Sequence, residues 1–109
     1  MQEKINREHL KRVFASELEP FDDAAEAALE EIVQVLSELT DQAIMVISMR
    51  WGIGEYDHPH TLEDVAKDAN CTRERVRQIE QKCLAKVRQR ILRLGRDAPR
   101  NKQQFLPIK

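Results

Sequence analysis

The chain has 109 residues, with 18 lysines and arginines, 19 aspartates and glutamates, and a net charge of −1. This length predicts one small domain with a modest core, which argues against a large catalytic cleft. No stretch reaches the roughly 20 apolar residues of a membrane span, and no apolar signal core follows the charged amino terminus, so a cytoplasmic protein is expected.

Three glycines and four prolines favour helices, and the first is expected over residues 3–18. Its apolar residues fall at helical spacings: Ile5, Leu10, Val13, Phe14 and Leu18. Pro20 ends this segment, and Asp22 or Asp23 can cap a second helix that runs to about Leu39. The second helix carries one apolar stripe: Ala24, Ala28, Leu29, Ile32, Val33, Leu36 and Leu39.

A third helix is expected after a cap at Thr40 or Asp41. It contains Ile44, Met45, Ile47 and Trp51. Gly52 offers the positive φ with which helices commonly end. Trp51 is interpreted as a core residue rather than a stacking platform, and GIGEYDHPH then forms a loop.

The pattern from Thr61 onward predicts a helix-turn-helix. Thr61, followed by Asp64, can cap a short helix over residues 62–69, and Asn70 tolerates the left-handed conformation of a tight turn. Thr72 can cap a helix that reaches at least Arg90. Small or apolar side chains would seal the corner between the two helices: Val65, Ala66, Ala69, Cys71, Val76 and Ile79.

The helix that starts at Thr72 has two distinct sides. One is an inward stripe of Val76, Ile79, Cys83, Val87, Ile91 and Leu94. The other carries Arg73, Glu74, Arg77, Gln78 and Lys82 on the turns that a recognition helix presents to the major groove. Arginine can pair with guanine, glutamate with cytosine and glutamine with adenine. The alternative is a solvated helix with ion pairs that join Arg73 or Arg77 to Glu74 or Glu80.

Charge is divided sharply along the chain. Residues 1–71 hold 6 basic and 16 acidic side chains, whereas residues 72–109 hold 12 basic and 3 acidic ones. This polarity is typical of a carboxy-terminal part that faces a polyanion, although a merely lopsided surface would give the same count.

Metal-binding and catalytic patterns are weak. His58, His60, Cys71 and Cys83 could be imagined as zinc ligands, but neither cysteine belongs to a CxxC pair and both are needed on apolar faces. No glycine-rich phosphate loop or meaningful nucleophile–histidine spacing occurs. We therefore expect no metal, no cofactor, no small-molecule substrate and no enzymatic activity.

The stretch HTLEDVAKDANCTRERVRQIEQKCLAKVR, with the upstream MRWGIG, resembles region 4 of the bacterial primary sigma factors of RNA polymerase. The similarity covers about residues 25–90. It implies an all-α fold, winged-helix-like but without strands. The expected division is an N-terminal helical extension over residues 1–20, the helix-turn-helix domain over 21–94 and a flexible basic tail over 95–109.

The resemblance also assigns roles by position. Residues that match Arg73, Glu74 and Gln78 read bases of the minus-35 promoter element. Phosphate or positioning roles fall to Thr61, Leu62, Thr72, Arg75, Arg77 and Lys82, some of them near bound activators. The preceding helices of the family dock on the polymerase β flap, which suggests contacts through Leu29, Ile32, Val33, Leu36, Met45 and Met49. Ala85 replaces an arginine that activators use.

Two functions follow as alternatives. The first is a DNA-binding transcription regulator held on polymerase, with activators or anti-sigma proteins as further partners. The second is a protein-interaction module that displaces the host sigma factor without reading DNA. No segment resembles the part that recognises and melts the downstream promoter element, so the chain is expected to be either an excised fragment of a larger factor or a free-standing regulator of phage or mobile-element type. The opening methionine and the unfamiliar tails favour the free-standing regulator. Phe105, Leu106 and Ile108 form either a docking motif or, more simply, part of a frayed terminus.

Overall fold

The computed structural model describes residues 7–19 and 21–94. Six helices follow one another there: α1 (Arg7–Val13), α2 (Ala15–Leu18), α3 (Asp23–Ser37), α4 (Asp41–Trp51), α5 (Leu62–Ala69) and α6 (Arg73–Arg93). No strand occurs among the described residues, which confirms the expected all-α fold. The expectations for Ile5, Pro20 and the tail from residue 95 onward concern residues outside this part of the chain.

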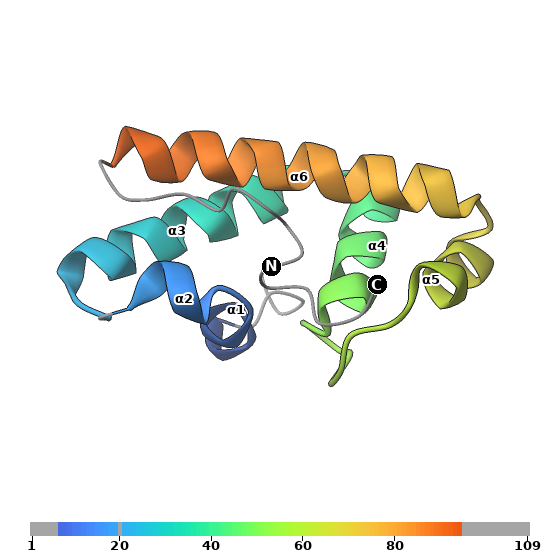
Figure 1. Ribbon diagram of the computed structural model, residues 1–109, viewed down its shortest axis with the longest axis horizontal. Helices are drawn as coiled ribbons and strands as arrows, with labels where there is room; N and C mark the ends of the chain where they lie inside the picture. Colours follow the sequence, from blue (N-terminus) through green and yellow to red (C-terminus); the bar gives the residue numbers. More distant parts are fainter. Residues whose placement is uncertain (1–6, 20, 95–109) are drawn as a thin grey trace.

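Helix α6 is the longest helix and runs along the length of the molecule (Figure 1). Its 21 residues extend about 32 Å at 1.5 Å per residue, along a molecule whose longest dimension is 39 Å. Helices α3, α4 and α5 all pack against it, and α1 and α2 pack against α3. None of the helices in the described ranges is long and apolar enough to span a membrane.

Side-chain caps fix where four helices begin. Asp22 accepts a hydrogen bond from the Ala25 amide at 2.9 Å, and Thr40 accepts one from the Ala43 amide at 3.2 Å. Thr61 and Thr72 cap α5 and α6 in the same way. Each cap satisfies an amide that has no partner within the helix, which is why these helices begin at the expected positions.

Gly52 ends α4 in the left-handed conformation, with φ 70° and ψ 50°. A Cβ atom at this position would lie 2.5 Å from the carbonyl carbon of His58. Glycine is therefore needed both for the backbone angle and for the close approach of the loop that leads to α5.

The core is shared by all six helices. Trp51 is 1% exposed and Phe14 is fully buried, and their rings meet edge to face with centroids 5.4 Å apart. Trp51 is therefore a core residue, as expected. Leu10, Val13 and Leu18 are also buried in this core, so the described part of the N-terminal extension packs on the domain. The division at residues 20 and 94 stays a prediction.

Three details differ from the expectations. The first helix is interrupted at Phe14 (φ −107°, ψ 30°), and this kink directs both Phe14 and Leu18 into the core. In α3, Ala24 is exposed, while Ala25 and Val35 are buried, because α3 is rotated slightly relative to the stripe expected from its strongest apolar residues. Leu94 is 42% exposed because α6 ends at Arg93, so helical spacing no longer directs Leu94 inward.

Candidate nucleic-acid interface

Helices α5 and α6 form the expected helix-turn-helix. Asn70 adopts the left-handed conformation (φ 56°, ψ 50°), and the Cys71 amide donates to the Ala66 carbonyl at 3.0 Å. Val65 and Val76 are fully buried in the corner, and Ala66 is 7% exposed. This closed turn and apolar corner hold the first turns of α6 in a fixed position relative to α5.

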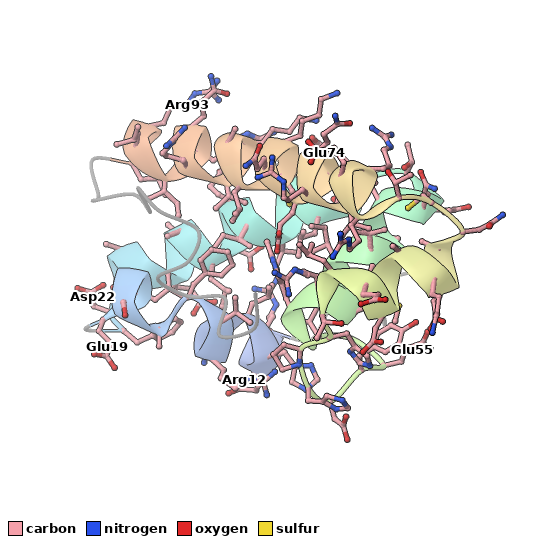
Figure 2. All side chains as sticks on the ribbon, turned by 45° about the vertical axis from the view of Figure 1, so that its right-hand side comes forward. Arg12, Glu19, Asp22, Glu55, Glu74 and Arg93 are labelled. Atoms are coloured by element: carbon pink, nitrogen blue, oxygen red, sulfur yellow. The ribbon has the colours of Figure 1, made fainter. Side chains whose placement is uncertain are left out.

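The three expected base-reading residues, Arg73, Glu74 and Gln78, are exposed on the first turns of α6. At about 100° per residue, Glu74, Gln78 and Lys82 share one face, and Arg73 flanks it. Glu74 lies on the side of α6 that faces away from the other helices (Figure 2). The arrangement is a continuous polar surface with donors and acceptors suited to base edges in a major groove.

Arg77 and Glu74 form an ion pair on this surface. Arg77 Nε and Nη2 donate to the two Glu74 carboxylate oxygens at 3.2 and 3.4 Å. The alternative of an ion-paired helix is thus correct for this pair. Such a half-exposed pair contributes only about 0–1 kcal/mol, so its partners can be exchanged for a phosphate and a base at small free-energy cost.

The positions expected at phosphates lie at the helix N-termini and along α6. Thr61 and Leu62 are half-buried at the start of α5, and the Thr61 and Thr72 hydroxyls are occupied as caps. Arg75 and Lys82 are exposed. The structure thus places all of these side chains on or beside the helix-turn-helix, with the α5 N-terminus more covered than α6.

Glu80 is not a surface ion-pair partner, as the alternative reading proposed, because it is fully buried inside the domain. Its Oε2 atom lies 3.3 Å from Arg50 Nε and accepts a hydrogen bond from Trp51 Nε1 at 3.3 Å. Arg50 in turn donates to the His60 carbonyl at 2.9 Å. We call Arg50, Trp51 and Glu80 the buried triad. It joins α4, α6 and the loop before α5, and so positions both helices of the motif.

The sequence carried one signal for the buried triad. Glu80 lies four residues after Val76 and three before Cys83, which places it on the inward stripe of α6. A carboxylate at such a position requires a buried partner, but the sequence alone does not show that Arg50, thirty residues earlier, supplies it.

The six residues expected at the polymerase β flap are placed differently from one another. Leu29, Ile32, Leu36 and Met49 are at most 2% exposed, so these four side chains build the core and are not available to a partner in this fold. Val33 and Met45 are half-buried. The apolar periodicity of the six residues marks the buried faces of α3 and α4. It does not distinguish core from partner surface, because core packing and partner binding select the same residue types.

Met45 lines a surface pocket of about 340 Å³ beside α4. The other lining residues are Asp41, Ile44, Ser48, Glu55 and Tyr56. Burial, and then the nearby Glu55 and Asp68 carboxylates, raise the pKa of Tyr56 above its usual value. The Tyr56 hydroxyl therefore stays protonated at neutral pH and can donate a hydrogen bond. The pocket combines apolar walls with two carboxylates.

The four residues considered as zinc ligands do not converge. His58 and His60 stack with ring centroids 4.5 Å apart, whereas Cys71 lies at the helix-turn-helix turn and Cys83 is buried on α6. No group of three or more histidine, cysteine or acidic side chains suited to a metal ion occurs in the described ranges.

We expect the two cysteines to differ in reactivity. Burial, with a smaller contribution from Glu80, raises the pKa of the Cys83 thiol from 9.0 to about 12, whereas Cys71 is half-exposed. At pH 8 roughly one Cys83 side chain in ten thousand would be the reactive thiolate. Iodoacetamide should therefore modify Cys71 in the native protein and Cys83 only after denaturation, as read by mass spectrometry. Equal native labelling would contradict this placement of Cys83.

Thr72→Ala is expected to lower the free energy of unfolding by about 1 kcal/mol, because the Arg75 amide loses the hydroxyl that caps α6. Urea denaturation followed by circular dichroism would measure the change. Thr72→Ser, which keeps a hydroxyl, is the matched control and should retain most of the stability. A loss of the same size in both variants would argue against the cap.

The fold and the exposed side chains of α6 define a helix-turn-helix module for DNA binding. A sequence model of sigma-70, region 4 matches residues 35–89, and the chain belongs to this family. It is thus a helix-turn-helix module of the sigma-70 region 4 type.

Similar curated proteins are sigma factors. RNA polymerase sigma factor RpoD of Neisseria gonorrhoeae is 41% identical over 75 residues, which cover 68% of this chain and 12% of that protein. SigA of Lactococcus lactis subsp. cremoris is 46% identical over 59 residues, 54% of this chain and 16% of its own length. SigA of Clostridium acetobutylicum is 43% identical over 70 residues, which cover 63% of this chain and 18% of that protein. The chain thus spans less than a fifth of these relatives, and no solved structure matches it.

Proposed function

We propose that this chain reads a minus-35-like promoter element through the first turns of α6 while it is held on bacterial RNA polymerase. The observation that carries the proposal is the exposure of Arg73, Glu74 and Gln78 on a helix whose orientation is fixed by the helix-turn-helix corner and the buried triad. Arg73 would pair with guanine, Glu74 with a cytosine amino group and Gln78 with adenine.

The flanking charges support contact with the DNA backbone. Arg75, Arg77 and Lys82 lie on or beside the same turns of α6, where they can position the helix through phosphates. The Thr61 and Thr72 regions mark the two helix N-termini, which are favourable places for phosphate groups. A single module of this size should bind DNA weakly and with strong salt dependence, so attachment to polymerase would raise its effective concentration at promoters.

For the polymerase contact we propose the α3–α4 side, with the β flap as partner and bacterial cytoplasm as the location. Val33 and Met45 are the members of the expected set that retain exposed surface. The pocket that Met45 lines has Asp41 and Glu55 at its edge, which suits an apolar partner side chain flanked by a basic one.

A second candidate is a module that occupies polymerase and displaces the host sigma factor without reading DNA. The ion pair between Arg77 and Glu74 favours it, because that pair satisfies Glu74 without a base. The exposed Arg73 and Gln78 favour the first candidate, since a competitor for polymerase alone would not need them.

Fluorescence anisotropy would separate the two candidates. A labelled minus-35 duplex and a scrambled duplex are titrated at two salt concentrations, with and without isolated β flap. Promoter reading predicts tighter binding to the minus-35 duplex and a further gain with the flap. Flap binding without any preference between the duplexes would overturn promoter reading and support the displacement candidate.

A further inference from the structure

Three large apolar side chains are exposed in the described part of the chain, and they lie at one end of the molecule. Phe21 is 43% exposed just before α3, and Leu92 and Leu94 are 57% and 42% exposed where α6 ends. The start of α3 and the end of α6 lie at the same end in Figure 1, as do Glu19 and Arg93 in Figure 2. We call it the α3–α6 end. Single exposed apolar side chains are common, but a group of them is a candidate contact surface.

Carboxylates at the start of α3 give the α3–α6 end a negative charge. Glu19, Asp23 and Glu26 are exposed, and none of the three forms an ion pair within the described ranges. The arginines that reach α3, Arg7 and Arg90, pair with carboxylates further along that helix. A segment that complements this end should therefore be apolar and basic.

The chain itself supplies a segment of this chemistry directly after α6. Residues 95–109, the tail, read GRDAPRNKQQFLPIK, with four basic side chains and one acidic side chain. Phe105, Leu106 and Ile108 are grouped near its far end. The tail therefore combines the positive charge and the apolar group that the α3–α6 end lacks.

The tail begins beside the surface that it would contact. A chain of the length between Leu94 and Phe105 spans at most about 40 Å and averages roughly 20 Å as a coil. Two groups joined over such a distance meet at an effective concentration in the millimolar range, so weak contacts suffice. The turns proposed to read bases, near Arg75, lie about 28 Å from Leu94 along α6. Distance therefore favours the α3–α6 end over DNA as the site that the tail occupies.

We propose that the tail folds back and docks on the α3–α6 end. Its three apolar side chains pack on the exposed apolar side chains there, and its arginines and lysines lie against the carboxylates at the start of α3. Lys11 Nζ of α1 lies 4.3 Å from the centre of the Phe21 ring, so the docked tail joins the end of α6 to the N-terminal extension. This contact is within one chain and does not depend on promoter reading.

Disulfide trapping in the full chain tests this docking. In a Cys71→Ser background, Gln104→Cys places a thiol in the tail and Ala24→Cys places one at the start of α3; the native Cys83 is buried. The matched control uses Ala85→Cys in place of Ala24→Cys, an equally small and exposed position about 12 Å from the end of α6. A tail that does not dock should reach both positions alike. Docking predicts that position 104 forms its disulfide with position 24 roughly tenfold or more faster than with position 85.

Two pairs of substitutions separate the apolar contact from the charged one. Phe105→Ser with Leu106→Ser, and separately Asp23→Asn with Glu26→Gln, should each lower the rate at position 24 toward the rate at position 85. Equal rates at the two positions with the unmodified tail would overturn the proposal. Faster trapping at position 85 once a minus-35 duplex is added, with no preference for position 24 in its absence, would also overturn it and assign the tail to DNA.

Discussion

Replacing Glu80 by alanine is expected to lower the free energy of unfolding by about 3–5 kcal/mol. The substitution leaves the Arg50 guanidinium, 4% exposed, without its carboxylate and removes the acceptor of the Trp51 indole N–H. Small domains are stable by about 5–15 kcal/mol in total, so this variant should unfold at a much lower urea concentration than the unmodified protein. Urea denaturation followed by tryptophan fluorescence and circular dichroism would measure the loss.

A double variant separates the charge from the packing. In Arg50→Met with Glu80→Leu, neither charge is buried, so the loss should be smaller than the sum of the two single variants, with a coupling free energy of about 1–3 kcal/mol. For Glu80→Gln, the loss of unfolding free energy should lie between those of Glu80→Ala and the double variant. The glutamine amide oxygen can still accept the hydrogen bond from Trp51, but the charge of Arg50 is left unbalanced. Additive effects of the two single substitutions would show that Arg50 and Glu80 do not act together.

Arg73→Ala is expected to remove about 1–3 kcal/mol of discrimination between the minus-35 duplex and a scrambled one, which is roughly 5- to 150-fold in relative affinity. Arg73 is exposed on α6, so the fold should be unaffected. The loss of affinity should be largest for the intact minus-35 duplex, and small both for the scrambled duplex and for a duplex in which only the guanine paired with Arg73 is replaced. Anisotropy titrations against both duplexes would measure it.

Two control variants keep this prediction specific. Arg93→Ala removes the same charge about 30 Å further along α6 and should leave discrimination unchanged. Lys82→Ala should weaken binding to both duplexes alike. It should also reduce the slope of log affinity against log salt concentration by about 1. Equal losses for Arg73→Ala and Arg93→Ala would mean that α6 attracts DNA only through its overall charge.

The local structure of this protein follows from its sequence because the signals act over a few residues. Thr61 and Thr72 begin helices since their hydroxyls reach the amide three positions later, and Gly52 and Asn70 end helices since both tolerate a positive φ. The spacing of Val65, Val76 and Ile79 then predicts the helix-turn-helix. The exposed polar positions of α6, which we propose to read bases, follow as the other side of that helix.

Long-range contacts were decided only by the tertiary structure. Apolar periodicity on α3 and α4 showed that Leu29, Ile32 and Met49 lie on a packed face, but not that this face is the core instead of a partner site, since both bury the same residue types. The ion pair of Arg50 with Glu80 joins residues thirty positions apart, and no local pattern links them. The sequence by itself determined helices α3 to α6, the caps that begin them and the side chains exposed on α6, through interactions within a few residues, whereas it did not predict the break at Phe14 between α1 and α2. Only the fold decided which apolar faces meet, because that depends on the shapes and charges of all six helices together.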